Sequence, residues 1–532
     1  MIPTCFNNWV LTDECHIVNS GATMRTPFRI ALLSSTLGAS TVLGLISNYT
    51  ETCKTIANSI SKDAGVYYWG MFDNSQSIHR QFIADRTHYT GHHLYHKGNG
   101  HWASSSSQDS ACVVEPANAE DVSTIVSFDS PLSPLSMVEN NPFQLRIVAN
   151  DSAPFGIRSG GHATNAGFSS TPGVQIALFK LSEVTYHQAP AAADGSVGTV
   201  DFGSGLVWDD VYAALQPHGV NVVGGRVTGV GVGGFTLGGG YSWLSNQYGL
   251  YEQLDYRYRN CFRTCSAEQY HHNSNRNTEP RPILRPKGQV WGGLSTFTSD
   301  QLDKVIQAST EFAQQVKDPK AAIIPTFNFL LEQPGVSLLM FYDGPTPPSG
   351  IFERFQSIPH FTSDVKTRSF TSLVQASPAN TTYGLRAAFN TVSLKNYSQP
   401  IIEQVLNQSK CWGKEASLKF KTDLFISYDV EPFLPTMNAR SKGGAYPHDD
   451  FLMPLNLYFG WVSHLDDKWF HDAIEESTRV IREQAIAEGQ DIAGDKQIKY
   501  GNYASANEDL SSDLKKKYDP NNVMNLAGGY RF

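Results

Sequence analysis

The residues with the clearest chemical potential are a histidine and the glycines just before it. Residues 158–162 read R-S-G-G-H and follow the strand-like apolar stretch 155–157. Glycines let the main chain approach a ligand and adopt positive φ, and successive N–H groups in such a turn can cradle an anion such as a pyrophosphate. His162 then supplies a nucleophilic imidazole. Alone, the pattern is weak evidence, because an isolated loop histidine is usually a solvated side chain.

A second glycine-rich run covers residues 224–240 and reads GGRVTGVGVGGFTLGGG. Each glycine costs backbone entropy on folding, so such a density requires a reason. Close approach of the main chain to a large ligand supplies one. A merely flexible loop fits less well, because valines and Leu237 are interleaved with the glycines.

The elements that would position these two runs alternate between strand and helix patterns. A short apolar strand at 112–114 precedes a helix that Asn118 can cap and whose apolar face is Val122, Ile125 and Val126. Strand patterns recur at 174–178 and 199–202. A helical face follows over 208–215, closed by Pro217 and Gly219. This succession, ending in glycine loops, indicates an α+β fold with a nucleotide-type site.

The pattern changes from about residue 294. A helix is predicted over 302–316 and another over 470–488, with alternating apolar runs at 322–342 and 424–461 between them. Alternation of this kind is typical of an antiparallel sheet with helices on one side. The sequence therefore predicts a second domain built on such a sheet.

Taken in order, these motifs resemble the FAD-binding domain of the vanillyl-alcohol-oxidase (PCMH) type. The resemblance is carried by R-S-G-G-H at 158–162, F-G-S-G-L-V-W at 202–208, and the glycine run at 230–240 with Tyr-Gly at 248–249. The C-terminal Y-G-N-Y at 500–503 and Y-D-P-N-N-V at 518–523 resemble the closing segment of berberine-bridge-enzyme-like proteins. Four ordered motifs, covering roughly residues 100–250 and 290–532, are far more specific than one.

The resemblance implies a covalent bond from His162 to the 8α-methyl carbon of FAD. Many relatives carry a second bond from a cysteine just before V-G-V-G-G; Val227, Thr228 and Gly229 stand there, so we expect a single link. The two glycine runs would cradle the pyrophosphate and ribityl chain, and Asn502 would contact the cofactor. The implied cofactor-binding residues are His162, Arg158, Ser159, Gly160, Gly161, Gly167, Gly229, Val230, Gly233, Gly234, Leu237, Gly238, Gly239 and Asn502.

Tyr500 is the expected general base, with a structural aromatic at the domain seam as the alternative. A tyrosine has a reference pKa of about 10, so this role requires nearby positive charge or a hydrogen-bond network. The function implied is transfer of a hydride from an alcohol, sugar or secondary metabolite to flavin, which O2 or another acceptor then reoxidises.

Two other functions remain open. A non-catalytic secreted glycoprotein on a decayed flavoenzyme scaffold is one. A nicotinamide dehydrogenase is the other: Gly229, Gly231 and Gly234 fit its fingerprint by letter, but that motif should directly follow the first strand, so this interpretation ranks below flavin.

Residues 251–287 depart from the family. An aromatic-Ala-Leu-Arg turn and a Gly-Gly-Gly-Asn-x-Gly loop touching the flavin are expected there, and the sequence instead is polar, basic and without period. A wrong reading frame or misplaced splice junction would produce this pattern, and 71–100 invites the same explanation. Lost strands would leave unpaired backbone groups and an open flavin wall.

Residues 24–46 have the pattern of a signal peptide: two arginines, then the uncharged run 30–46. We expect Met24 to be the true start and 1–23 an upstream extension; a buried N-terminal helix is the alternative. Secretion also agrees with five glycosylation sequons, at Asn48, Asn150, Asn380, Asn396 and Asn407.

The expected domains are a leader at 1–46, an FAD-binding domain at 47–295, a substrate domain at 296–480 and a closing segment at 481–532. In an oxidising compartment Cys53 and Cys112 can pair. Cys261 and Cys265 lie near His271 and His272, but the spacing is poor for structural zinc.

The charge pattern narrows the partners. Of the 532 residues 17% are charged, the net charge is −9, and no basic block stands out, which makes nucleic acid an unexpected partner. The uncharged N-terminal run is short and interrupted for a membrane span. We expect a monomer that acts on a small molecule.

Overall fold

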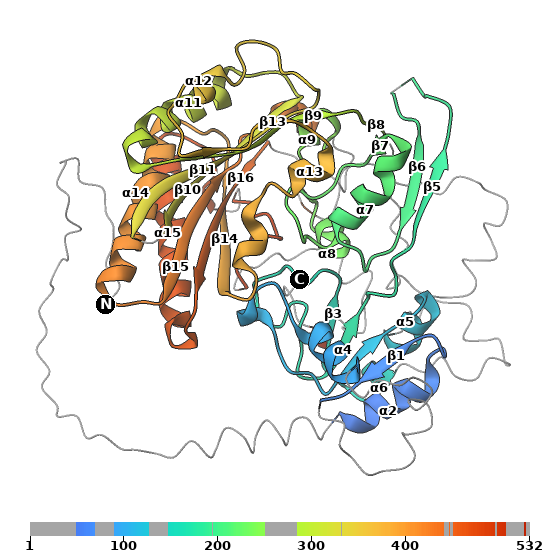
Figure 1. Cartoon of the computed structure of the whole chain (residues 1–532). Helices are drawn as coiled ribbons and strands as arrows, with labels where there is room; N and C mark the ends of the chain where they lie inside the picture. Colours follow the sequence, from blue (N-terminus) through green and yellow to red (C-terminus); the bar gives the residue numbers. More distant parts are fainter. Residues whose placement is uncertain are drawn as a thin grey trace, which may run out of the picture.

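A computed structural model describes residues 49–69, 90–126, 147–193, 195–250, 285–330, 332–440, 446, 451–494, 497–506 and 526–527. Figure 1 shows a small lobe formed by the N-terminal elements, a glycine-rich middle part, and a large sheet with long helices on one side. The proposed leader, residues 251–284, Cys261, Cys265 and the segment 518–523 lie outside the described residues.

The small lobe is built on a four-stranded sheet in the order β1-β2-β4-β3. β1 (Gly65–Tyr67) is antiparallel to β2 (Cys112–Glu115), whereas β4 (Val174–Ala177) runs parallel to both β2 and β3 (Phe155–Arg158). Buried aliphatic side chains cover it. The helices of this lobe are α2 (Thr50–Ser59), α4 (Thr90–Asn99), η1 (Ser104–Ser106), α5 (Ala119–Val126) and α6 (Ile147–Asn150).

The predicted cap and disulfide are both present in this lobe. Asn118 Oδ1 accepts a hydrogen bond from Asp121 N at 2.8 Å, at the start of α5. Cys53 of α2 is joined to Cys112 of β2 by a disulfide. Residues 90–99, where the sequence shows no period, form α4 and bury Tyr95.

The middle part packs around Trp208. The hairpin of β5 (Val184–Gln188) and β6 (Gly198–Phe202) leads into α7 (Trp208–Leu215), and η3 (Gln216–His218) ends at Gly219 with φ +64°. An added Cβ at Gly224 would lie 2.4 Å from Trp208 Cε3, so packing explains that glycine. The remaining elements are α8 (Val232–Leu237), α9 (Ser245–Tyr248), and the pair β7 (Val220–Asn221) and β8 (Arg285–Pro286).

The large sheet has eight strands, and every pair in it is antiparallel, as the alternating runs predict. Its order is β12-β9-β11-β10-β15-β16-β14, with β13 also on β9. The strands are β9 (Val290–Phe297), β10 (Ala321–Leu330), β11 (Gln333–Tyr342), β12 (Thr362–Ser363), β13 (Lys366–Arg368), β14 (Arg386–Leu394), β15 (Asp423–Val430) and β16 (Met453–Trp461).

Side chains alternate between the two faces of this sheet. The outer face packs, through residues such as Tyr428 and Leu457, on α11 (Leu302–Gln315), α14 (Gln399–Leu418) and α15 (Asp467–Ala487). The inner face, with Ile324 and Phe341, joins the core around Trp208. The shorter helices are η5 (Ser299–Gln301), α12 (Glu353–Gln356), α13 (Phe370–Val374), η6 (Pro378–Thr382), η7 (Pro435–Arg440) and η8 (His464–Asp466).

One strand of the large sheet begins before the expected domain boundary. β9 begins at Val290 and pairs with β11, so the predicted boundary at 295/296 cuts through a strand of the large sheet. At the end of the chain Ala527 forms a parallel bridge with Phe155 of β3, which brings the closing segment back to the small lobe. Across the described ranges no helix is both long and apolar enough to span a bilayer.

Replacing Cys53 with serine should lower the free energy of unfolding by about 2–4 kcal/mol, because the disulfide closes a long loop in the unfolded chain. The two cysteines are 59 residues apart. Denaturant titrations of the C53S variant and the unaltered protein measure the difference. Under reducing conditions the two should unfold alike, and a gap that persists there would contradict the explanation.

Candidate active site

The two glycine-rich runs touch each other through their main chains. An added Cβ at Gly160 would lie 2.5 Å from Gly231 Cα, and one at Gly231 would lie 2.3 Å from Gly160 N. Atoms of the peptide backbone cannot yield as a side chain can, so neither position admits any other residue without displacement. The contact joins the end of β3 to the start of α8.

Ser159 holds the same junction by hydrogen bonds. Its Oγ donates to Ser204 O at 2.6 Å and accepts from Gly233 N at 3.0 Å. On the other side Asp209 of α7 accepts from Thr228 Oγ1 at 2.7 Å and from Gly229 N at 2.9 Å. The predicted cradle residues are therefore assembled by contacts within the chain.

The predicted cofactor-binding residues differ in where their side chains and main-chain groups lie. Arg158 is buried against α4, where it donates to Lys97 O and lies over Phe179, its carbon Cζ 4.8 Å from the ring centroid. Gly161 and Gly229 adopt positive φ, as do Gly167 and Gly239. An added Cβ at Gly167 or Gly234 would meet no atom within 4 Å, so open space adjoins the cradle there. Val230 O accepts from Trp208 N, and the Leu237 side chain is exposed.

His162 lies directly beyond this junction in an aromatic setting. Its imidazole stacks on Trp102 with ring centroids 4.4 Å apart and planes 12° apart. Its Nε2 is enclosed and has no hydrogen-bond partner among the described residues. Burial lowers the pKa of His162 to about 4, so the imidazole is neutral at physiological pH.

The C-terminal residues Tyr500 and Asn502 lie beside the second glycine run. Asn502 lies against Gly238, where an added Cβ would come within 2.2 Å of Asn502 Oδ1. Asn502 Nδ2 donates to the Tyr500 hydroxyl at 2.8 Å. Asn165, three residues after His162, donates to Ala504 O at 3.0 Å. The closing segment therefore contacts both glycine runs.

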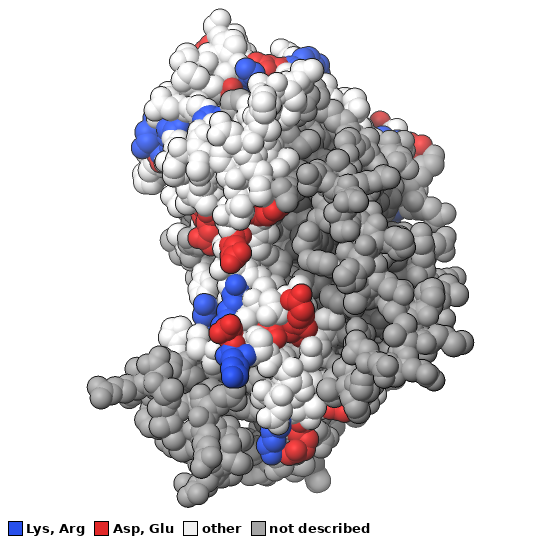
Figure 2. All heavy atoms as spheres, turned by 90° about the vertical axis from the view of Figure 1, so that its right-hand side faces the viewer, with Lys and Arg blue, Asp and Glu red and all other residues white. Residues whose placement is uncertain are grey.

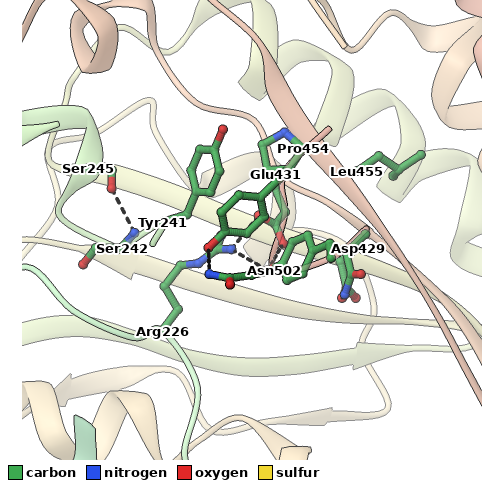
Figure 3. Close-up of polar contacts among 12 residues, drawn as sticks. Arg226, Tyr241, Ser242, Ser245, Asp429, Glu431, Pro454, Leu455 and Asn502 are labelled. Atoms are coloured by element: carbon green, nitrogen blue, oxygen red, sulfur yellow. Dashed lines mark hydrogen bonds and ion pairs between the residues drawn. The ribbon is translucent and has the colours of Figure 1, made fainter. Parts of the chain in front are cut away.

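A buried ion pair lies beside Tyr500. Arg226 Nη2 lies 2.5 Å from Glu431 Oε2 and also donates to the Tyr503 hydroxyl at 3.0 Å (Figure 3). Tyr503 in turn donates to Glu431 Oε1 at 3.1 Å. Burial raises the pKa of Glu431 to about 7 although Arg226 opposes the rise. Burial also raises the pKa of Tyr500, and Arg226 offsets only part of that effect.

Asp429 of β15 is a second carboxylate, two residues before Glu431, which directly follows the end of the strand. It accepts from Thr326 Oγ1 at 2.7 Å and from Asn456 Nδ2 at 3.0 Å, and both of these donors are neutral. Burial raises its pKa above the ordinary carboxyl range. Two residues along β16 from Asn456, Tyr458 lies 5.2 Å from Trp102 between ring centroids, so Asp429 faces the side on which His162 lies.

Four residues of this site were not among the sequence predictions: Trp102, Arg226, Asp429 and Glu431. Arg226 lies inside the second glycine run. A positively charged residue among glycines could have marked it as a site residue. The carboxylates alternate with apolar residues at the end of β15, which also marked one face of a strand. Nothing in the local sequence marks Trp102, because its partner is 60 residues away.

The surface charges and the candidate metal ligands among the described residues indicate no further site. Figure 2 shows the side of the molecule that lies at the right in Figure 1. On the part of it that is drawn in colour, acidic and basic side chains are interspersed. Within the described ranges there is no group of three or more histidine, cysteine or acidic side chains suited to a metal ion.

Comparison with known proteins gives the same cofactor and fold. Residues 144–255 match a family described as FAD binding domain. An FAD-linked oxidoreductase of Arthroderma benhamiae is 28% identical over 410 residues, 69% of this chain and 72% of that protein. The FAD-dependent monooxygenase drtC of Aspergillus calidoustus is 27% identical over 497 residues, 86% and 89% of the two chains.

Among solved structures, BBE-like 1 of Physcomitrella patens superimposes with a TM-score of 0.58 at 14% identity, covering 89% of this chain and 97% of that one. A variant of berberine bridge enzyme, solved in complex with (S)-reticuline, gives 0.56 at 14% identity, with 90% and 91% covered. At these identities the likeness shows the fold, and the fold is that of the berberine-bridge-enzyme-like flavoenzymes.

Replacing Gly231 with alanine should destabilise the protein by about 1–3 kcal/mol and weaken FAD retention, because the new Cβ meets the main chain of Gly160. Gly288, whose added Cβ would meet nothing within 4 Å, provides the matched control G288A. Thermal unfolding and the ratio of bound flavin to protein measure both effects. Equal behaviour of the two variants would rule out a tight junction.

Replacing Arg226 with methionine should cost about 3–5 kcal/mol at pH 8, because Glu431 is left as an unpaired buried carboxylate. Binding a proton neutralises Glu431 and removes the cost of an unpaired buried charge. Its folded-state pKa stands above the unfolded value, so the loss should shrink as pH falls from 8 to 6. Adding Glu431→Leu should recover part of the loss; denaturant titrations at both pH values test the cycle.

Proposed function

We propose that this chain, an FAD-linked oxidoreductase with the fold of berberine-bridge-enzyme-like flavoenzymes, carries its flavin on His162 and oxidises an alcohol, sugar or secondary metabolite. The observation that carries the proposal is the junction of the two glycine runs beside His162, whose Nε2 is enclosed and has no partner among the described residues. Bound FAD supplies a two-electron acceptor for the substrate C–H bond.

The residues present fit FAD. Gly160 and Gly231 leave the main chain without side chains where the two runs meet, and open space adjoins Gly167 and Gly234. His162 is neutral, which a nitrogen nucleophile must be. Arg158 does not join the cradle through its side chain, so its role is to brace the turn from behind.

The inner face of the large sheet is the proposed substrate side. Hydroxyl, amide and carboxylate groups follow its middle strands, and Phe389 and Tyr458 lie nearer His162. Such a face can hydrogen-bond a hydroxylated substrate while aromatic rings exclude water near the flavin. The polar residues concerned are Thr326, Asn328, Ser337, Ser427, Asp429 and Asn456.

We assign the removal of the substrate proton to Asp429 and keep Tyr500 as the competing candidate. Glu431 is occupied by Arg226 and Tyr503, whereas Asp429 accepts from neutral donors. A carboxylate with a raised pKa is a stronger base. Tyr500, with a raised pKa, stays protonated at neutral pH and is suited to donate a hydrogen bond.

Monooxygenation is the second candidate reaction. It rests on the name of the Aspergillus calidoustus relative, which matches most of this chain. Simple oxidation with O2 yields hydrogen peroxide, whereas monooxygenation places one oxygen atom in the product. Product mass in ¹⁸O2 distinguishes the two reactions.

Secretion is proposed on two observations. The leader pattern of residues 24–46 is one. The disulfide between Cys53 and Cys112 is the other, since such bonds persist in oxidising compartments, and Cys411 is disulfide-bonded as well. Asn396 is exposed in its sequon, which agrees with glycosylation there.

The purified protein should be yellow, and the flavin colour should stay with the pellet after acid precipitation. In His162→Ala the flavin should be released into the supernatant, because the attaching nitrogen is gone. His187→Ala, at a partly exposed histidine of β5, is the matched control and should keep the colour in the pellet. A colourless, well-folded protein would favour the inert-scaffold alternative.

Asp429→Asn should slow reduction of the bound flavin by about 10²–10⁴-fold, because the proton acceptor is lost. In the unaltered protein the rate should rise with pH through a pKa above the ordinary carboxyl range, since only the ionised form accepts a proton. Tyr500→Phe should keep that limb of the profile. Stopped-flow measurement of flavin reduction, with a substrate found by screening, tests this assignment. If Tyr500→Phe loses the pH-dependent limb and Asp429→Asn keeps it, the base is Tyr500.

A further inference from the structure

Trp102 is fixed by both its main chain and its side chain. Its N donates to Gly161 O at 2.9 Å, within the turn that carries His162, and its O accepts from Gly384 N at 2.9 Å. The indole Nε1 donates to Ala379 O at 3.2 Å. Only 6% of the residue is exposed. With both ends held, the indole ring has one orientation.

The loop around Trp102 also ties the histidine turn to the large sheet. Ser105 Oγ donates to Ala387 O and accepts from Ala387 N, at 3.1 and 3.0 Å. Thr164 Oγ1 accepts from Phe389 N at 3.2 Å. Trp102 is therefore held between the small lobe and β14.

The flat face of the indole sets the plane of the His162 ring. The two ring planes differ by 12°, which is a stacked arrangement, whereas Phe389 and Tyr458 meet Trp102 at 40° and 46°. An imidazole attached at the end of a glycine turn would otherwise rotate about two side-chain bonds.

We propose that Trp102 is a positioning residue that holds the His162 imidazole in the orientation needed for bonding to flavin. The inference rests on the covalent link proposed above. Forming that link takes one hydrogen from the flavin 8-methyl group and one from the neutral imidazole, and joins carbon to nitrogen. The two electrons and two protons released reduce O2 to hydrogen peroxide. Trp102 takes no part in the bond changes.

The alternative is a tryptophan that only fills space. Phenylalanine keeps an aromatic plane against His162, whereas leucine fills volume without one, so W102F and W102L separate stacking from filling. W102A removes both. Trp69, which is 55% exposed, supplies the matched control W69A.

The experiment follows flavin that resists acid precipitation over time, after FAD is added to cofactor-depleted protein. W102A and W102L should form the bond more slowly, on the order of tenfold or more, because a small misplacement of reacting groups is costly. W102F and W69A should match the unaltered protein. Histidine-selective NMR of the cofactor-free proteins, with the His162 signal assigned through His162→Ala, gives a second readout. The pKa of His162 should rise from about 4 toward its ordinary value in W102A.

The outcomes separate this role from the proposed function. If both W102A and W102L form the covalent bond at an unchanged rate, the role of Trp102 is overturned and the proposed covalent link stands. Release of flavin by acid from the unaltered protein would overturn both. If W102A does not fold, W102L compared with W102F decides.

Discussion

The contact between the main chains of Gly160 and Gly231 is the constraint on which the site depends. It admits no Cβ on either side, so it holds the end of β3 close against the start of α8. Ser159 then bridges Ser204 and Gly233 across the same junction. Because His162 follows Gly160 by two residues, its position is set by this contact before any ligand arrives.

A second level of organisation brings distant segments to that junction. Trp102, from the loop after α4, hydrogen-bonds to Gly161 and stacks on His162, and Asn502, from the closing segment, lies against Gly238. The large sheet is held to the histidine turn through Ser105 and Thr164. The site therefore exists only when the small lobe, the glycine loops and the sheet are all folded together, which couples cofactor binding to stability.

The parts of the fold and site that depend on local sequence pattern could be predicted from the sequence. Alternating apolar residues predicted the antiparallel sheet, because one face of each strand is buried on the helices. Glycine spacing and its family resemblance predicted the cradle and its FAD. The sequence could not show that Gly224 serves packing on Trp208, that Arg158 turns toward α4, or that Trp102 stacks on His162. Each of these depends on contacts between residues far apart in the chain, and α4 itself is held by such packing rather than by an apolar period.

Asp429 in β15 and Glu431, one residue beyond the end of that strand, show how two neighbouring acids can have different uses. Glu431 is buried and Asp429 is half-buried, and both would be costly if ionised without partners. Arg226 meets that cost for Glu431 and, with Tyr503, occupies its oxygens. Asp429 accepts hydrogen bonds from the neutral donors Thr326 and Asn456, which lower its pKa, but burial outweighs them and the pKa of Asp429 stays raised. The ion pair of Arg226 and Glu431 thus leaves Asp429 as the carboxylate proposed to accept the substrate proton.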